Sequence, residues 1–252
     1  MSQPRAPEGW TLYAVGDIHG RLDLFEGLLD RIDADLSRLP EGGQAALILL
    51  GDYVDRGPKS REVIELARSL EGSGGCVVHA LKGNHEEALL DFLREPGEGP
   101  VWGEFGGVAT LASYGIGPPT PRSDRAAWER ARDTLAAAMP PEHLAFLQGL
   151  ALSVTYCDYL FVHAGVRPRV PVADQDPHDL MWIRHDFLKG DWRGPPVVVH
   201  CHTPSPEPQL EHWRIGVDTG AYATGVLTAV RLEGTGREIL QARSGQVRPG
   251  GR

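Results

Sequence analysis

The sequence of 252 residues has little cysteine and no excess of positive charge. Its three cysteines, Cys76, Cys157 and Cys201, are odd in number and far apart, which excludes a disulfide framework and favours free thiols in a reducing compartment. The formal net charge of −9 argues against nucleic acid as a partner, because phosphate backbones bind basic surfaces. A disulfide-stapled domain and a nucleic-acid-binding domain are therefore both disfavoured.

Long apolar runs are also absent. No run approaches the roughly 18 apolar residues that indicate a membrane span, and the N-terminal MSQPRAPEG lacks the apolar core of a signal peptide. We therefore expect a cytoplasmic protein with no membrane partner; the sequence leaves the oligomeric state open.

What is present suits one large α/β domain. The apolar fraction of 41% is enough to bury a sizeable core, and the length predicts a single domain over residues 1–252. We expect flexible ends at 1–9 and 243–252. Residues 95–142 read as a mainly helical insertion after a Gly- and Pro-rich start, and they either cap the functional site or pack away from it.

The first third of the chain repeats one pattern three times: a strand, a polar loop and a helix. Strands are expected at 10–15, 45–50 and 76–81, and they lead into GDIHG at 16–20, GDYVDRG at 51–57 and GNHE at 83–86. Crossovers of this kind join parallel strands and are right-handed. The three loops should therefore lie side by side at one edge of a sheet, where open α/β sheets build their sites.

The second half returns to β-structure. Residues 152–156 and 159–163 flank a two-residue connection and predict a hairpin. A β-branched run at 197–202 ends in His202, and strands at 225–232 and 238–242 should pair.

Six polar residues sit where strands end, and together they predict a metal centre. Two carboxylates, one amide and three imidazoles suit borderline divalent ions such as Mn, Fe or Zn, and no cysteine pair has the spacing of a structural zinc site. In the Asp-x-His of GDIHG, two residues of an extended segment point the same way. We interpret Asp52 as the ligand shared by two ions. The six residues are Asp17, His19, Asp52, Asn84, His163 and His202.

These motifs, with HAG at 163–165, HTP at 202–204 and the turn at 218–220, resemble the phosphoprotein phosphatase (PPP-type) family of calcineurin-like metallophosphoesterases. The bacterial and bacteriophage lambda type serine/threonine phosphatases look most similar. The resemblance implies a four-layer α/β/β/α sandwich, with the insertion in its middle third. It also implies a dinuclear centre, most simply of Mn, with Fe or Zn as alternatives.

The resemblance implies a role for each motif residue. Asp17, His19 and Asp52 would hold one ion, and Asp52, Asn84, His163 and His202 the other. A hydroxide bridging the ions would attack phosphorus directly. His85, oriented by Asp55, would protonate the leaving oxygen, and Arg56 and Arg184 would grip the phosphoryl oxygens. Arginine suits this task because its planar fork makes bidentate contacts with phosphate.

Other polar residues are given ordinary roles. Glu86 should support the N-terminus of a helix, where negative charge is favoured. Cys201 stands where the family usually has glycine, and strand alternation points it away from His202 as a small buried hydrophobe. His200 could support the site or be purely structural. Five more histidines are expected to be structural: His79, His143, His178, His185 and His212.

Three functions remain open. The first is a metal-dependent phosphomonoesterase acting on phosphoserine or phosphothreonine in proteins, with phosphorylated protein or a small phosphate ester as its partner. The second, within the same fold, is a symmetrical diadenosine tetraphosphate hydrolase. The third is a non-catalytic module that binds phosphorylated ligands; the presence of His85, Asp55 and Arg56 together argues against it, because a binder needs no general acid.

Overall fold

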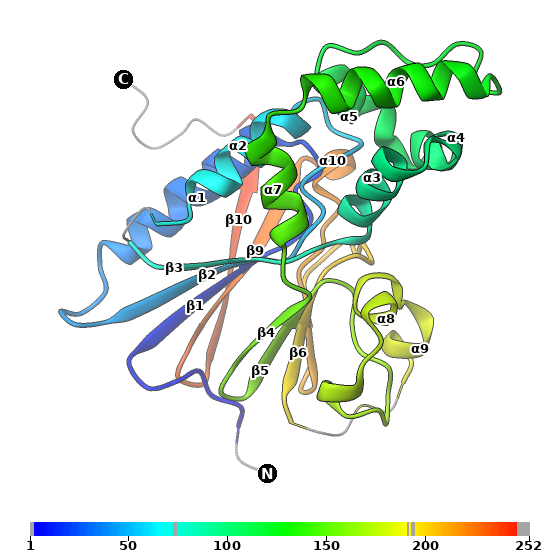
Figure 1. Ribbon diagram of the computed structural model, residues 1–252. Coiled ribbons are helices and arrows are strands. Elements are labelled where there is room, and N and C mark those ends of the chain that lie inside the picture. Colours follow the sequence, from blue (N-terminus) through cyan, green and yellow to red (C-terminus); the bar gives the residue numbers. More distant parts are fainter. Residues whose placement is uncertain (1–2, 73–74, 191, 193–194, 246–252) are drawn as a thin grey trace.

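One sheet carries all three strand–loop–helix units (Figure 1). The computed structural model describes residues 3–72, 75–190, 192 and 195–245. The sheet order is β10-β9-β1-β2-β3, in which β1 and β2 pair in parallel, as do β2 and β3. β9 is antiparallel to β1 and to β10, so the pairing predicted at the C-terminal end of the chain is confirmed. The strands are β1 (Trp10–Val15), β2 (Gln44–Leu49), β3 (Val77–Ala80), β9 (Val226–Glu233) and β10 (Gly236–Arg243).

The second sheet has the order β4-β5-β6-β8-β7. β4 and β5 form the predicted antiparallel hairpin, whereas β5, β6 and β8 run parallel. Because β5 and β6 are parallel, His163 and His202 follow them at the same edge of the sheet. The strands are β4 (Ser153–Tyr156), β5 (Tyr159–Val162), β6 (Val197–His200), β7 (Gln209–Leu210) and β8 (Arg214–Gly216).

Strand alternation sorts the core into three layers. In β1, Tyr13 and Val15 face the helices of the first sheet, whereas Leu12 and Ala14 face the second sheet. The second sheet repeats this alternation, since the side chain of Phe161 enters the layer between the sheets. Apolar side chains on the other face of that sheet pack beneath the last layer of helices. The result is the α/β/β/α sandwich that the resemblance implied.

Helices cover both outer faces (Figure 1). Against the first sheet lie α1 (Leu22–Leu36) and α2 (Ser60–Ser69), with α7 (Pro141–Gly149) beside α2. Against the second lie α8 (Pro177–Trp182) and α9 (His185–Leu188), preceded by a 3₁₀ turn η3 (Val172–Asp174). α2 begins at Ser60 rather than directly after the GDYVDRG loop, because Asp55 and Arg56 adopt left-handed backbone angles and Lys59, with φ −128° and ψ 45°, is still outside the helix.

The insertion packs as a series of short helices after α3 (Asn84–Arg94), beyond the ends of the strands (Figure 1). An aromatic cluster joins it to α3: Trp102 stacks on Phe92 with ring centroids 4.6 Å apart, and Trp128 meets Phe92 edge-on at 5.8 Å. The segments are η1 (Pro96–Glu98), α4 (Gly99–Trp102), η2 (Gly103–Gly107), α5 (Val108–Ser113) and α6 (Arg125–Ala138).

The two ends of the chain were expected to be flexible, and parts of both lie outside the described residues. Within the described part, the Ala6 amide donates to the carbonyl of Gly234 at 2.8 Å and the Arg5 amide donates to Asp158 at 2.9 Å. None of the helices in the described part of the chain is long and apolar enough to cross a membrane.

Candidate metal centre

The six predicted ligands come together where strands of both sheets end, and each side chain is at least nine-tenths buried. Asp52 lies between the others: its Oδ2 is 3.5 Å from His19 Nε2, and its Oδ1 is 3.5 Å from His163 Nε2. Asp17 Oδ2 lies 3.9 Å from His19 Nε2. On the other side, Asp52, His163 and His202 offer ligand atoms that all lie within 4.8 Å of one another. This arrangement is the one expected if Asp52 is shared between two ions.

Hydrogen bonds outside the cluster set the tautomers of two histidines. His19 Nδ1 lies 2.7 Å from the carbonyl of Val54, and His163 Nδ1 lies 2.9 Å from the carbonyl of Leu50. A carbonyl only accepts, so the proton of each neutral ring is on Nδ1. Both Nε2 atoms therefore present a lone pair to the cluster, as metal-ligating imidazoles do.

On the Asn84 side, the lone pair of His163 Nε2 faces the amide oxygen of Asn84, and one ring nitrogen of His202 has no partner. Asn84 Oδ1 is 3.0 Å from His163 Nε2 and 2.9 Å from His202 Nδ1, and the buried Nε2 of His202 has no hydrogen-bond partner. Converging lone pairs repel unless a cation lies among them. Nitrogen and oxygen donors of this kind fit Mn, Fe or Zn. The residues present therefore fit the ions that the motifs predict.

Burial keeps the imidazoles neutral and raises the pKa of the aspartates. It lowers the pKa of His163 to about 3 and holds the pKa of His202 below its ordinary range. Burial, and then the charge of Asp218, raise the pKa of Asp17. Burial, and then the charge of Asp17, raise the pKa of Asp52. Divalent cations bind to neutral imidazoles and to carboxylates that lack a positively charged partner.

The backbone of the site is strained. Seven non-glycine residues of the described chain have positive φ, and five of them belong to the predicted site. Such residues cost on the order of 1–3 kcal/mol each and persist where the surrounding structure fixes them. The five are His19 (46°), Asp52 (54°), Asp55 (71°), Arg56 (67°) and His202 (70°).

His85 and Asp55 form a buried pair beside the ligands, as predicted. His85 Nδ1 is 2.6 Å from Asp55 Oδ2, and its other nitrogen, Nε2, points towards the cluster, 4.0 Å from Asp52 Oδ2. The guanidinium of Arg56 spans this side of the site, with Nη1 2.9 Å from His19 Nε2 and Nη2 3.0 Å from His85 Nε2. His85, whose ring can carry a proton, and the planar cation of Arg56 therefore lie on the same side of the ligand cluster.

Arg184 is less closely tied to the cluster. It immediately precedes α9 and its side chain is exposed. Its charge is among the influences that, after burial, lower the pKa of His163 and His202, which places it towards that end of the site. The role of Arg184 in binding phosphoryl oxygens stays a prediction.

Glu86 does more than support a helix. Its carboxylate accepts from the Gly83 amide at 2.9 Å and so caps the N-terminus of α3, as expected. It also accepts from the amides of Asp52 and Tyr53, both at 2.8 Å. One buried carboxylate therefore holds the GDYVDRG loop against the GNHE loop.

Residues left out of the predicted site are mainly structural. His200 is buried edge-on against Phe187 at 5.0 Å, and burial lowers its pKa to about 4, which favours the structural interpretation. Cys201 is buried between the sheets as expected, and its Sγ lies 3.3 Å from Nδ1 of His163. Strand alternation relates Cys201 only to its neighbour His202, so it does not predict this contact with a residue that follows another strand.

Three further residues reach the site from distant parts of the chain. Trp102 and Thr110 donate to Asp55 at 3.0 and 2.6 Å, and Tyr222, on α10 (Ala221–Thr224), places its ring 4.7 Å from the Arg56 guanidinium. Their sequence context gave little signal, since the first two lie in the insertion and the third follows the turn at 218–220.

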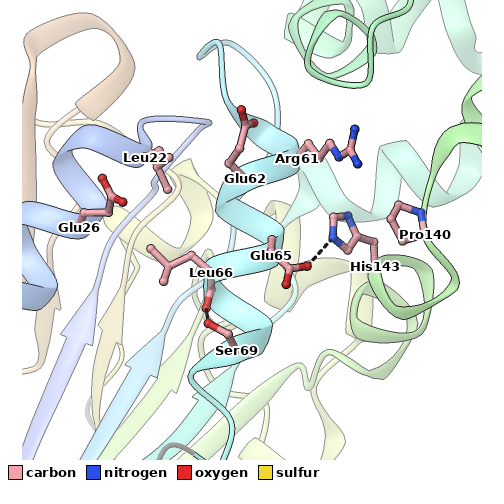
Figure 2. Close-up of a pocket in the computed structure, with 9 residues that line it drawn as sticks. All are labelled: Leu22, Glu26, Arg61, Glu62, Glu65, Leu66, Ser69, Pro140 and His143. Atoms are coloured by element: carbon pink, nitrogen blue, oxygen red, sulfur yellow. Dashed lines mark hydrogen bonds and ion pairs between the residues drawn. The ribbon is translucent and has the colours of Figure 1, made fainter.

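A separate hollow of about 430 Å³ lies beside α2, with α1 on one side and the start of α7 on the other (Figure 2). Its lining includes none of the predicted site residues. There His143 Nε2 lies 2.9 Å from Glu65, and His143 Nδ1 lies 2.8 Å from the Tyr114 hydroxyl, so this histidine joins α7 to α2 and to the insertion. The structural role expected of His143 is consistent with these contacts.

Known proteins resemble the chain over most of its length. A bis(5'-nucleosyl)-tetraphosphatase PrpE [asymmetrical] from Anoxybacillus flavithermus is 26% identical over 238 residues, covering 86% of this chain and 88% of the relative. A solved structure described as a putative diadenosine tetraphosphatase has a TM-score of 0.65 at 22% identity and covers 93% of this chain and 95% of its own. A cold-active protein-tyrosine phosphatase of a Shewanella species has a TM-score of 0.56 at 18% identity, covering 95% and 83% respectively.

The two solved structures show that the fold is shared. The profile of the calcineurin-like phosphoesterase family matches residues 11–225, which include every predicted site residue. The chain belongs to the calcineurin-like phosphoesterase family.

Proposed function

We propose that this phosphoesterase is a dinuclear metal-dependent hydrolase whose substrate is a dinucleoside tetraphosphate. The observation that carries the metal requirement is the convergence of buried ligand atoms around Asp52 and Asn84: the lone pair of His163 Nε2 faces an oxygen of each, and the buried Nε2 of His202 has no hydrogen-bond partner. The substrate class is supported by the tetraphosphatases that are similar over most of the chain.

Asp17, His19 and Asp52 would hold one ion, and Asp52, Asn84, His163 and His202 the other. When bound, two such ions would lower the pKa of water and stabilise the attacking and leaving oxygens of an in-line displacement. Mn is the first candidate, with Fe and Zn as alternatives, because mixed carboxylate, amide and imidazole ligands suit all three.

The residues around the ligands would handle the phosphoryl group and the leaving group. Arg56, whose two terminal nitrogens point along the site, would bind phosphoryl oxygens bidentately, and Arg184 would add a second cation. His85 would donate a proton from Nε2 to the leaving oxygen while Asp55 holds Nδ1. A positioned general acid contributes roughly 10²–10⁴-fold to the rate.

A phosphoserine or phosphothreonine ester in a protein is the second candidate substrate. The buried His85–Asp55 pair favours it, because a serine or threonine alkoxide leaves only with a proton, whereas a nucleotide phosphate is a good leaving group without one. The sequence alone ranked this substrate first. The similarity to a tetraphosphatase over 86% of the chain leads us to place the dinucleoside tetraphosphate first and the phosphoprotein second.

Comparison of the two substrates with metal-loaded protein tests the proposal. We expect diadenosine tetraphosphate to give a higher kcat/KM than phosphoserine peptides, and the products to reveal the cleavage site: ATP and AMP for asymmetrical hydrolysis, two ADP for symmetrical hydrolysis. A clear preference for the phosphopeptide would overturn the substrate assignment. Binding of both without hydrolysis would instead identify a non-catalytic module.

Replacement of His85 tests its role separately. His85→Asn should keep the full metal content and lose at least about 100-fold in turnover of a phosphate ester with a poor leaving group. Loss of bound metal would make His85 a ligand rather than the acid.

A further inference from the structure

The insertion contributes directly to the surroundings of the proposed general acid. The Asp55 carboxylate, which faces His85, is completely buried and receives side-chain hydrogen bonds from two residues far along the chain. Trp102 Nε1 donates to Asp55 Oδ2 at 3.0 Å, the same oxygen that meets His85 Nδ1 at 2.6 Å. Thr110 Oγ1 donates to Asp55 Oδ1 at 2.6 Å. Both oxygens are thus occupied, and the plane of the carboxylate is fixed.

Thr110 also fixes the backbone of Asp55. The Asp55 amide donates to Thr110 Oγ1 at 2.9 Å and to Ser60 Oγ at 3.0 Å. Asp55 has φ 71°, a left-handed conformation that an aspartate keeps only when its surroundings hold it. One buried hydroxyl therefore accepts from the backbone of Asp55 and donates to its side chain.

Trp102 is held from several sides, so its N–H has a defined direction. Its ring stacks on Phe92, which lies on α3, the helix that also carries His85. On another side, a Cβ added to Gly107 would lie 2.3 Å from the ring, so this position has room only for glycine. The indole is 2% exposed, and water has almost no access to its side of Asp55.

We propose that Trp102 and Thr110 are positioning residues for catalysis: they hold Asp55 so that His85 Nε2 is directed at the leaving oxygen. The insertion at 95–142 thereby becomes part of the catalytic apparatus. This inference rests on the proposed function, in which His85 is the acid. It predicts that replacing either residue lowers kcat more for a leaving group that needs a proton than for one that leaves readily as an anion.

Two aryl esters separate this role from a merely structural one. p-Nitrophenolate leaves readily as an anion, whereas the more basic phenolate of phenyl phosphate depends more on proton donation. Trp102→Phe keeps the stacked ring and removes the N–H, and Thr110→Val keeps the shape and removes the hydroxyl. For each variant we expect kcat on phenyl phosphate to fall about 10-fold and kcat on p-nitrophenyl phosphate to fall less than about twofold, as for partial loss of a general acid.

Matched variants control for packing. Trp128→Phe changes a tryptophan of the same aromatic cluster whose Nε1 donates to Arg122 instead, and it should leave the ratio of the two rates unchanged. Thr110→Ser should restore the ratio lost in Thr110→Val, because it returns the hydroxyl. Metal content and KM should stay at wild-type values in all four proteins.

Equal falls on both esters, or no change on either, would overturn the inference. His85→Asn, measured in parallel, distinguishes the two possible failures. If His85→Asn itself does not discriminate between the esters, the assignment of the acid is wrong. If it discriminates and the Trp102 and Thr110 variants do not, only the positioning role is wrong.

Discussion

The Asp52 carboxylate faces both groups of predicted metal ligands, and the backbone of the GNHE loop packs closely against it. A Cβ added to Gly83 would lie 2.1 Å from Asp52 Oδ1 and 2.6 Å from the Asp52 amide. The φ angle of Gly83 is −93°, so space rather than backbone angle requires glycine here. The GNHE loop can therefore approach the GDYVDRG loop only if its first residue has no side chain.

Gly83→Ala should push Asp52 out of position and weaken metal binding. We expect a loss of about 10- to 100-fold in affinity for Mn²⁺, the range found when groups that orient metal ligands are disturbed. Isothermal titration of chelated protein would measure it. Gly117→Ala, at a position where an added Cβ meets nothing within 4 Å, is the control and should bind as wild type does. Equal affinity in both variants would show that Asp52 does not depend on this close packing.

Tyr222 is an exposed aromatic residue beside the predicted phosphate-binding residue Arg56. Its ring is 40% exposed, lies 4.7 Å from the Arg56 guanidinium and meets the His19 ring edge-on at 5.4 Å. An exposed cation–π pair contributes about 0.5–1 kcal/mol. Tyr222→Leu should therefore raise KM about two- to fivefold with little change in kcat, while Tyr222→Phe keeps the ring and the wild-type KM. A fall in kcat alone would mean that the ring does not act through Arg56 in substrate binding.

The residues whose proximity could be predicted from the sequence are those that follow strand ends. Asp17, Asp52 and Asn84 follow parallel strands at equivalent positions, so the pattern of the chain alone brings them to one sheet edge. The residues it missed act across the fold: Trp102 and Thr110 meet Asp55 from 47 and 55 residues away. Such contacts depend on how the insertion docks, and neither periodicity nor a motif encodes that.

At the scale of elements, α1 is attached to the first sheet by polar contacts as well as by its apolar face. Asp35, near the end of α1, accepts from the Tyr13 hydroxyl of β1 at 2.5 Å and from Arg231 Nε of β9 at 2.6 Å. Burial acts to raise the pKa of Asp35, but these hydrogen bonds outweigh it and hold the pKa below its usual value. A group whose pKa is lower in the folded state stabilises the fold when it is ionised.

Asp35→Asn should therefore destabilise the protein at neutral pH and have less effect in acid. We expect a loss of about 1–2 kcal/mol in the free energy of unfolding at pH 7, typical of hydrogen bonds to a charged group. The difference from wild type should shrink as the pH falls below about 4, where Asp35 becomes protonated in the folded wild type too. Urea unfolding at several pH values would measure it, with Asp33→Asn, an exposed carboxylate on the same helix, as control. A difference that does not depend on pH would contradict the role of the Asp35 charge.

Most elements could be predicted because their apolar periodicity is local, and the exceptions have specific causes. Pro58 would suit the first turn of a helix, but α2 begins only at Ser60, after the strained backbone of Asp55 and Arg56. β7 has only two residues, Gln209 and Leu210, too few for a period to be visible. The order of the second sheet depends on long connections, and only the β4–β5 hairpin could be predicted directly.

At the scale of the whole molecule, the chain is acidic, and a site for phosphate within it must gain positive charge from outside. The net charge is −9, and burial, followed by the charge of a neighbouring carboxylate, raises the pKa of both Asp17 and Asp52. Two divalent ions would add about +4 and make the local field attractive to a phosphate dianion. Without them, the two carboxylates would repel the substrate.

Metal stoichiometry joined to activity is the most direct test of this account. Protein stripped by exhaustive chelation and then reconstituted with Mn²⁺ should contain two ions per chain by elemental analysis, and p-nitrophenyl phosphate hydrolysis should be absent before reconstitution and restored after it. Fewer than two ions per chain in the reconstituted protein, or equal hydrolysis by the stripped protein, would contradict the central claim that Asp52 is shared between two catalytic cations.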